Sequence, residues 1–305
     1  MTHYQNGSVF CCRLCSTING MPIINSTVLM SGTDYFSDEF AINAYMDDSV
    51  AIDSEDAALE HFAIRKAFEE AGIHVVKVHP PEDCQDGVYT ANWGLVRGNK
   101  VILSNLPNKR KDEEAYASSV LKTFGKEVIP APYHFSGQGD ALPCGNLLFM
   151  GSVYRTDPRM HEFVERELGF KVIALQTVPQ YDENHQPVIN RVSGWPDSFF
   201  YDIDLALSVI SPTLIAWCPD AFTEDSQEKI RALDIDKIEV SLDEATKGFA
   251  CNLVSTGETV IMSAHAPELA ATLKTKGLNI ITPKITELAK GGGYIRCTSL
   301  TLDNQ

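Results

Sequence analysis

The last fifteen residues, GGGYIRCTSLTLDNQ, place Cys297 on an expected strand shortly after three consecutive glycines, Gly291–Gly293. A cysteine that only packs in a strand behaves as a small hydrophobic residue and does not need such an approach. A nucleophile that a substrate must reach does benefit from it, because glycine has no Cβ to keep backbone and ligand apart. Cys297 is therefore a candidate nucleophile, with ordinary strand packing as the alternative.

Polar side chains recur at one position of a repeated unit and give Cys297 candidate neighbours. They lie on what we expect to be the first strand of each unit: Asn92, Asp140, Asp202 with Asp204, and Asn252. Independent packing accidents would not recur at one position of a repeat, so we expect these residues to converge on a central pit of acids, amides and one thiol. Each also has a structural alternative: a turn cap for Asp140, pairing of buried backbone groups for the two asparagines, and a solvated strand edge for Asp202 and Asp204.

Acidic side chains around a thiol are suited to a cationic substrate. Two carboxylates can hold a planar guanidinium group through paired, charge-assisted hydrogen bonds. A bound cation also favours the thiolate, which is the nucleophilic form of cysteine. The expected chemistry is attack of the sulfur on the guanidinium carbon, loss of an amine, and hydrolysis of the resulting thiouronium intermediate.

The elements that must position these residues follow one order, strand–strand–helix–strand, four times at intervals of about 50 residues. Hydrophobic runs separated by turn residues, followed by a helical period, predict each unit. The first unit is expected at residues 88–96, 101–104, 113–124 and 127–129, and the order returns from residues 140, 205 and 252. The two ends of the chain supply a fifth unit, with strands at 294–300, 26–30 and 74–78 and a helix at 57–71.

A ring that joins the two termini would leave no open sheet edge. No linker rich in proline, glycine or serine divides the chain. The sequence therefore predicts an α/β protein, a five-bladed α/β propeller with pseudo-fivefold ββαβ repeats, and a single domain over residues 1–305.

Composition excludes several classes of function. The 305 residues are 44% hydrophobic, enough for a large core, and carry a net charge of −16, which disfavours a nucleic-acid partner. No window approaches the roughly 18 apolar residues needed to span a bilayer, and the N-terminus lacks the pattern of a secretion signal. We expect a cytoplasmic protein with no nucleic-acid or membrane partner, and the sequence leaves a homo-oligomer open.

The eight cysteines follow no disulfide framework. Cys11, Cys12 and Cys15 are clustered, but a metal site would need a fourth ligand at a suitable spacing, and none follows nearby. An incidental cluster is the preferred interpretation. Covalent sulfur catalysis needs no ion, so neither a metal nor a cofactor is predicted.

Motifs along nearly the whole chain resemble the guanidine-modifying, or pentein, superfamily, most closely the bacterial branch related to dimethylarginine dimethylaminohydrolase and amidinotransferases. These motifs are AINAYMDDSVAID, DGVYTANWGLV, GQGDAL, YRTDP, FACNLVSTGE and GGGYIRCTSL. The resemblance implies the propeller fold and a small-molecule guanidino substrate. It also implies that Asp140 binds the guanidinium group, that Cys297 is the nucleophile and that Arg155 binds a substrate carboxylate. A surface arginine at the start of a helix is the alternative for Arg155.

Three positions depart from the pattern of the family. One is Ser136, which stands where an acid usually opens the GxxD-like motif. Hydrolases of the family usually carry a His-x-Asp pair where this chain has FYDIDLAL, so Asp202 stands in place of the histidine and Asp204 is the retained acid. General acid–base catalysis at neutral pH needs a pKa near 7, which Asp202 reaches only if burial and crowding with Asp140 and Asp204 raise it. Asn92 stands where the related dimethylaminohydrolases more often carry an acid, which resembles members that act on arginine itself.

The leading hypothesis is hydrolysis of a linear amidine at its C–N bond, with arginine or a substituted arginine as substrate and a thiouronium intermediate on Cys297. Asp202 and Asp140 are the further catalytic candidates, and the substrate-binding candidates are Asn92, Asp204, Arg155 and Asn252. Amidino transfer to an acceptor amine is one alternative. A non-catalytic relative that binds a guanidino ligand is another, favoured by the absence of the usual histidine.

Overall fold

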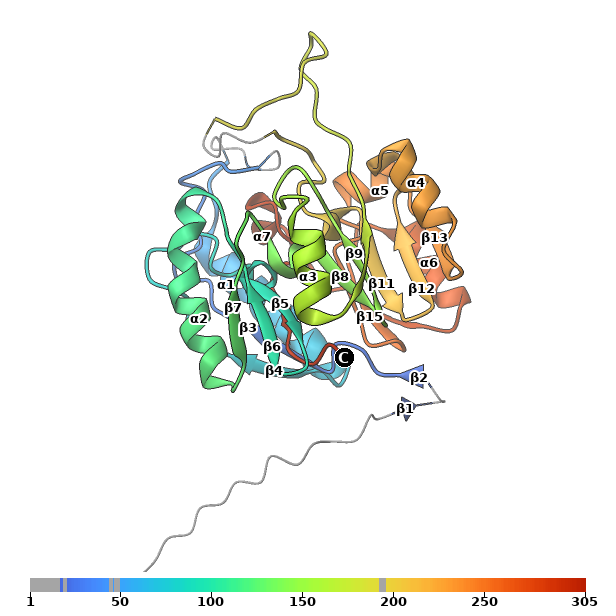
Figure 1. Cartoon of the computed structure of the whole chain (residues 1–305). Helices are drawn as coiled ribbons and strands as arrows, with labels where there is room; N and C mark the ends of the chain where they lie inside the picture. The colour runs from blue at the N-terminus through green and yellow to red at the C-terminus, as the bar shows by residue number, and fades with distance from the viewer. Residues whose placement is uncertain (1–16, 19–20, 44–45, 47–49, 192–195) are drawn as a thin grey trace, which may run out of the picture.

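Five three-stranded sheets with the same strand order form the framework of the computed structural model, which describes the chain except for residues 1–16, 19–20, 44–45, 47–49 and 192–195 (Figure 1). In each sheet the first strand pairs antiparallel with the second, and the second pairs parallel with the third. The sheets are β5 (Gly94–Arg97), β6 (Lys100–Leu103) and β7 (Glu127–Pro130); β8 (Ala141–Cys144), β9 (Leu147–Met150) and β10 (Lys171–Ala174); β11 (Leu207–Ser211), β12 (Leu214–Trp217) and β13 (Asp236–Glu239); β14 (Val254–Ser255), β15 (Thr259–Ile261) and β16 (Asn279–Ile281); and β17 (Leu300–Thr301), β3 (Thr27–Met30) and β4 (His74–Lys77).

A helix crosses over between the second and third strands of every sheet, as the parallel pairing requires. These helices are α1 (Ser54–Glu70), α2 (Glu113–Thr123), α3 (Met160–Leu168), α4 (Glu224–Arg231) and α6 (Pro267–Thr275). In α3, the buried Met160, Val164 and Leu168 recur every four residues, and Gly169 ends the helix with a φ of 73°. Shorter elements complete the described chain: α5 (Leu242–Lys247), α7 (Glu287–Lys290), and the strand pair β1 (Thr17–Ile18) and β2 (Met21–Pro22).

The fifth sheet joins the two ends of the chain. β17 pairs antiparallel with β3, so that Leu300 lies opposite Leu29, and both side chains are fully buried. First strands of successive sheets also touch, because β11 lies against both β8 and β14. The mixed α/β class predicted from the sequence is confirmed. None of the described helices is long and apolar enough to cross a membrane.

The polar residues singled out above lie on tight turns that lead into the first strands, and the prediction that they lie on the strands is wrong. Asn92 lies in the 3₁₀ helix η1 (Thr90–Trp93), Asp140 follows η3 (Gly137–Gly139), and Asp204 lies in η4 (Ile203–Leu205). Residues 88–93 are all buried, whereas a half-buried strand alternates between its two faces. The turns therefore hold these side chains together at one end of the first strands.

The expected strand at residues 294–300 is likewise reduced to β17, and Cys297 lies in the turn before it. The glycines of this segment have a packing reason. A Cβ added at Gly291 or Gly293 would lie 2.3 Å from an atom of the Tyr89 side chain. The glycines therefore let the chain pass close to Tyr89, and their part in the approach of a substrate stays a prediction.

Candidate active site

Cys297 is held between an amide and a carboxyl group. Its side chain is 3% exposed. The Sγ atom accepts a hydrogen bond from Asn252 Nδ2 at 3.1 Å and donates one to Asp204 Oδ2 at 3.3 Å. Asn252 Oδ1 accepts in turn from the backbone N–H of Arg296 at 2.9 Å. Asn252 thus fixes both the turn that carries the thiol and the sulfur atom itself.

Three carboxyl groups gather around the same turn. Asp202 and Asp204 lie on either side of Ile203, whose backbone N–H donates to Asp140 Oδ1 at 3.0 Å. Asp202 Oδ2 accepts from Asn92 Nδ2 at 2.8 Å. The Oδ1 atoms of Asp202 and Asp204 are buried and accept no hydrogen bond from the residues that the structure describes. The site therefore presents two buried carboxyl oxygen atoms that are free to accept hydrogen bonds.

Burial and mutual repulsion favour the protonated, uncharged forms of the three carboxyl groups and the thiol. Burial raises the pKa values of Asp140 and Asp204 well above the ordinary range, and the nearby Asp202 carboxylate raises both further. Burial also raises the pKa of Asp202, while the charge of Arg155 opposes that rise. The pKa of the Cys297 thiol is well above its usual value because of burial and then Asp204. A cationic ligand would reverse these effects and favour both the carboxylates and the thiolate.

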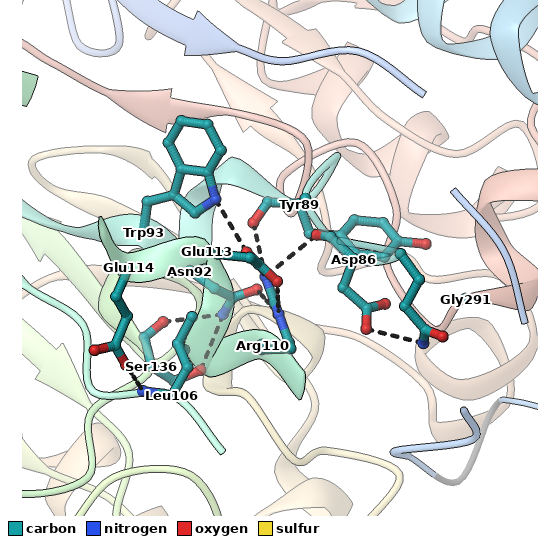
Figure 2. A network of polar contacts seen from close by, with 12 residues as sticks. Asp86, Tyr89, Asn92, Trp93, Leu106, Arg110, Glu113, Glu114, Ser136 and Gly291 are labelled. Carbon is teal, nitrogen blue, oxygen red and sulfur yellow. Dashed lines mark hydrogen bonds and ion pairs between the residues drawn. The ribbon is translucent and has the colours of Figure 1, made fainter. Parts of the chain in front are cut away.

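Asn92 belongs to a network of polar contacts that reaches α2 (Figure 2). Asn92 Nδ2 donates to the backbone oxygen and to Oγ of Ser136, each at 2.9 Å, as well as to Asp202. Asn92 Oδ1 accepts from Arg110 Nη1 at 2.9 Å. Arg110 forms a two-point ion pair with Glu113, with distances of 2.8 Å from Nε to Oε1 and 3.0 Å from Nη2 to Oε2. The Asn92 amide is thus oriented by fixed partners on both sides.

Two buried arginines that were not expected from the sequence supply positive charge near the acids. Arg110 is 5% exposed, although it lies within the run NKRKDEE, which has the composition of a solvated segment. Arg296 precedes Cys297, is buried, and donates to neutral oxygens, Gln138 Oε1 at 2.8 Å and Thr301 Oγ1 at 3.0 Å. Its charge lowers the pKa of Asp204, against the larger effect of burial. No local signal in the sequence distinguishes these arginines from exposed ones.

Arg155 is buried rather than exposed, so the surface alternative for this residue is wrong. Its Nη2 atom donates to the backbone oxygen of Ile42 at 2.9 Å, and its guanidinium carbon lies 4.4 Å from the centre of the Tyr201 ring. The Tyr201 hydroxyl donates to Gly292 O at 2.7 Å, in the segment that leads to Cys297. Arg155 also lines a cavity of about 230 Å³. It is therefore placed between the candidate site and an open space.

Among the described residues, no group of three or more His, Cys, Asp or Glu side chains is arranged to hold a metal ion. The cluster of Cys11, Cys12 and Cys15 lies outside the described residues. The absence of a metal or cofactor remains a prediction.

Known proteins resemble this chain over most of its length. The family model described as N,N dimethylarginine dimethylhydrolase, eukaryotic, matches residues 33–302. The N(G),N(G)-dimethylarginine dimethylaminohydrolase of Mycobacterium tuberculosis is 30% identical over 275 residues, which cover 90% of this chain and 84% of that protein. The bifunctional arginine dihydrolase/ornithine cyclodeaminase AgrE of Nostoc sp. is 28% identical over 279 residues, which cover 89% of this chain but 37% of that protein.

Solved structures agree with these matches. The N-terminal domain of ArgZ, an arginine dihydrolase from the ornithine-ammonia cycle in cyanobacteria, has a TM-score of 0.81 at 26% identity, over 91% of this chain and 97% of that domain in complex with product. A variant of the same domain carries a covalently bound reaction intermediate. The dimethylarginine dimethylaminohydrolase of Pseudomonas aeruginosa shares the fold, with a TM-score of 0.69 at 18% identity.

The fold and these matches together show that the chain is a relative of the dimethylarginine dimethylaminohydrolases and amidinotransferases within the pentein superfamily, as the sequence predicted. More narrowly, the chain belongs to the N,N dimethylarginine dimethylhydrolase family, whose model matches nearly all of it.

Proposed function

We propose that the protein hydrolyses the guanidino group of arginine or a substituted arginine through a covalent thiouronium intermediate on Cys297. The observation that carries this proposal is the pair of buried, unpartnered Oδ1 atoms of Asp202 and Asp204 beside the thiol. A buried acceptor without a partner is costly, and the N–H groups of a guanidinium ion would satisfy both atoms. The names of the relatives, which are hydrolases of guanidino compounds, support the same substrate class.

In the proposed reaction, binding of the cation ionises the thiol, whose proton passes to solvent. The sulfur then bonds to the guanidinium carbon, Asp202 gives its proton to the departing nitrogen, and the C–N bond breaks. Water adds to the same carbon while Asp202 takes back a proton. The added hydroxyl then gives its proton to solvent as the C–S bond breaks, which leaves a neutral ureido product, the thiolate and a reprotonated Asp202. Asp140 and Asp204 hold the guanidinium group throughout, and Asp202 Oδ1 faces the nitrogen that departs. Asn92 and Asn252 hold Asp202 and the sulfur in place.

We propose that the five sheets are the blades of a single propeller domain closed through β17 and β3. The pairing of β17 with β3 and the contacts of β11 with β8 and β14 support this arrangement. In such a ring the turns before the first strands meet at one end of the central axis, where the thiol and the acids gather.

Mass measurement of the intact protein tests the function. The protein is incubated separately with arginine, dimethylarginine and agmatine, while released ammonia and dimethylamine are measured. We expect an adduct on Cys297 together with a ureido product for one of the three compounds. Binding of a guanidine without an adduct or a released amine would instead identify a non-catalytic relative, which the replacement of the usual histidine by Asp202 favours. Transfer of the amidino group to an added amine would identify a transferase.

Replacement of Arg155 by alanine tests the carboxylate contact. Arginine carries a carboxylate that agmatine lacks, and a buried arginine can bind it through two parallel hydrogen bonds. We expect Arg155→Ala to lower kcat/KM for arginine about 100-fold, because a lost hydrogen bond to a charged group costs up to about 3 kcal/mol and about 1.4 kcal/mol corresponds to a tenfold change. The kcat/KM for agmatine should be nearly unaffected. Arg159→Ala, which removes an exposed arginine paired with Asp157, is the matched control. An unchanged preference between the two substrates would contradict this role.

Treatment with a chelator tests the expectation that no metal takes part. Sulfur attack and proton transfer by Asp202 require no ion, so turnover is expected to stay within about twofold after dialysis against EDTA. Loss of turnover that an added divalent ion restores would show that the acids bind a hard cation instead.

A further inference from the structure

A second cavity lies away from the thiol, between α1 and the ends of β3 and β4. Its volume is about 730 Å³, within the range of small-molecule sites. The lining comes from three segments: Ser31–Asp34 after β3, one face of α1, and Lys77–Pro80 at the end of β4. The face of α1 consists of Ser54, Ala58, His61, Phe62 and Arg65. None of the residues of the proposed catalytic machinery lines it.

The lining is basic, in a chain whose net charge is −16. Arg65 and Lys77 carry positive charge, and Asp34 is the acid of the lining. Arg65 uses Nη1 to pair with Glu69 at 3.1 Å, which leaves other guanidinium donors for a ligand. Lys77 forms no ion pair with any described residue and is exposed. Arg65 comes from α1 and Lys77 from the end of β4. Two cations in one lining suit a ligand with a doubly charged oxyanion group.

A buried histidine in the same lining has an unused nitrogen. His61 is 8% exposed, and its Nε2 atom has no hydrogen-bond partner among the described residues. The pKa of His61 is lowered to about 4, mainly by burial and then by the charges of Arg65 and Lys77, while Asp34 opposes these effects. The ring is therefore neutral near pH 7. In the tautomer that carries the proton on Nε2, this N–H can donate to an oxyanion, whose charge would also raise the pKa of His61.

The remaining walls can hold the organic part of a ligand. Ala58, Phe62, Val78 and Pro80 give the lining its apolar side chains, and Phe62 is 49% exposed. Gly32 lies at the cavity, where an added Cβ would be 2.7 Å from Asp34 Oδ2 and 3.2 Å from Pro80 Cδ. We propose that this cavity is a second site, which binds a small phosphorylated metabolite with its phosphate between Arg65, Lys77 and His61.

The segment that lines this cavity continues to the candidate active site. Phe36 packs edge-to-face on Tyr89 with ring centroids 5.8 Å apart. Ile42 O accepts from Arg155, and Asn43 Nδ2 donates to Gly291 O at 3.1 Å. A ligand that holds Ser31–Asp34 would therefore restrict the segment that positions Arg155, and we expect it to change the KM for the guanidino substrate. This consequence rests on the proposed function, whereas ligand binding does not.

Calorimetric titration of the full-length protein with AMP, ribose 5-phosphate and pyrophosphate tests the site, with citrate as a non-phosphate anion. We expect saturable binding of at least one phosphate compound to the parent and equally to Cys297→Ser. Lys77→Gln and Arg65→Gln should each weaken it at least tenfold, and Asp34→Asn should tighten it. Lys247→Gln, which removes the same charge from an exposed side chain on α5, should have no effect. The His61 pKa, followed by NMR, should rise when ligand is bound.

Each outcome decides one part of the proposal. No binding at millimolar concentrations, or binding unaffected by Lys77→Gln and Arg65→Gln, would overturn the site. Citrate binding as tight as that of the phosphates would overturn the phosphate assignment. Binding without any change in KM would overturn the coupling alone, and a protein that binds phosphate but turns over no guanidine would refute the proposed function while leaving the site intact.

Discussion

Cys297→Ser is expected to abolish turnover while the fold stays intact. The serine hydroxyl fills nearly the same volume, and it can donate to Asp204 and accept from Asn252 as the thiol does. It ionises far less readily than a thiol, even with a guanidinium ion bound, so its nucleophilicity collapses. We expect kcat to fall by roughly 10⁴-fold or more, the scale of loss when a nucleophile is removed from an enzyme. Steady-state release of amine and the intact mass of the protein measure this loss.

The matched control is Cys144→Ser. Cys144 is also buried, and its thiol lies 3.7 Å from Ser211 O and 3.4 Å from Pro212 O, where a hydroxyl can take its place. This variant should keep its activity and its substrate adduct. The nucleophile would have to be sought elsewhere if Cys297→Ser turned over substrate at the parent rate, or if the adduct formed on another residue.

The clustering of the candidate residues could be predicted because the chain repeats one topology. When the same strand order returns, residues at equivalent positions fall at the same end of their sheets, and so Asn92, Asp202 and Asp204 approach Cys297 from distant parts of the sequence. The mixed α/β class followed from the same repeat. The roles of these residues in catalysis stay predictions.

The remaining features depend on packing that a periodic pattern does not encode. An arginine becomes buried where other segments supply hydrogen-bond acceptors for it, as Asn92 does for Arg110 in addition to the nearby Glu113. The start of β5 was predicted too early, since hydrophobicity does not separate a fully buried 3₁₀ turn from a buried strand. The role of Gly291 next to Tyr89 likewise became visible only when the two segments met.

Replacement of Asp202 should have the second large effect, because it is the proposed proton carrier. Burial raises its pKa, so the carboxyl keeps its proton at pH values where an exposed aspartate, with a pKa of about 3.9, has lost it. The first step uses that proton, so kcat should fall as the pH rises through the raised pKa. Asp202→Asn keeps the shape and the contact with Asn92 but cannot transfer a proton, and we expect a loss of about 10²- to 10⁴-fold.

Asp202→His distinguishes an active enzyme from a relative that only binds its ligand. A histidine restores the residue that hydrolases of the family usually carry, with an unperturbed pKa near 6.5. In an active parent, Asp202→Asn should be nearly inactive and should lose the pH dependence, while Cys297 still forms a slow adduct. An inactive parent with an active Asp202→His variant would mean that the chain binds guanidines and lacks a working base. If Asp202→Asn were as fast as the parent at every pH, Asp202 would have no part in proton transfer, and the pH dependence would have to come from Asp140 or Asp204, which share its burial and its repulsion.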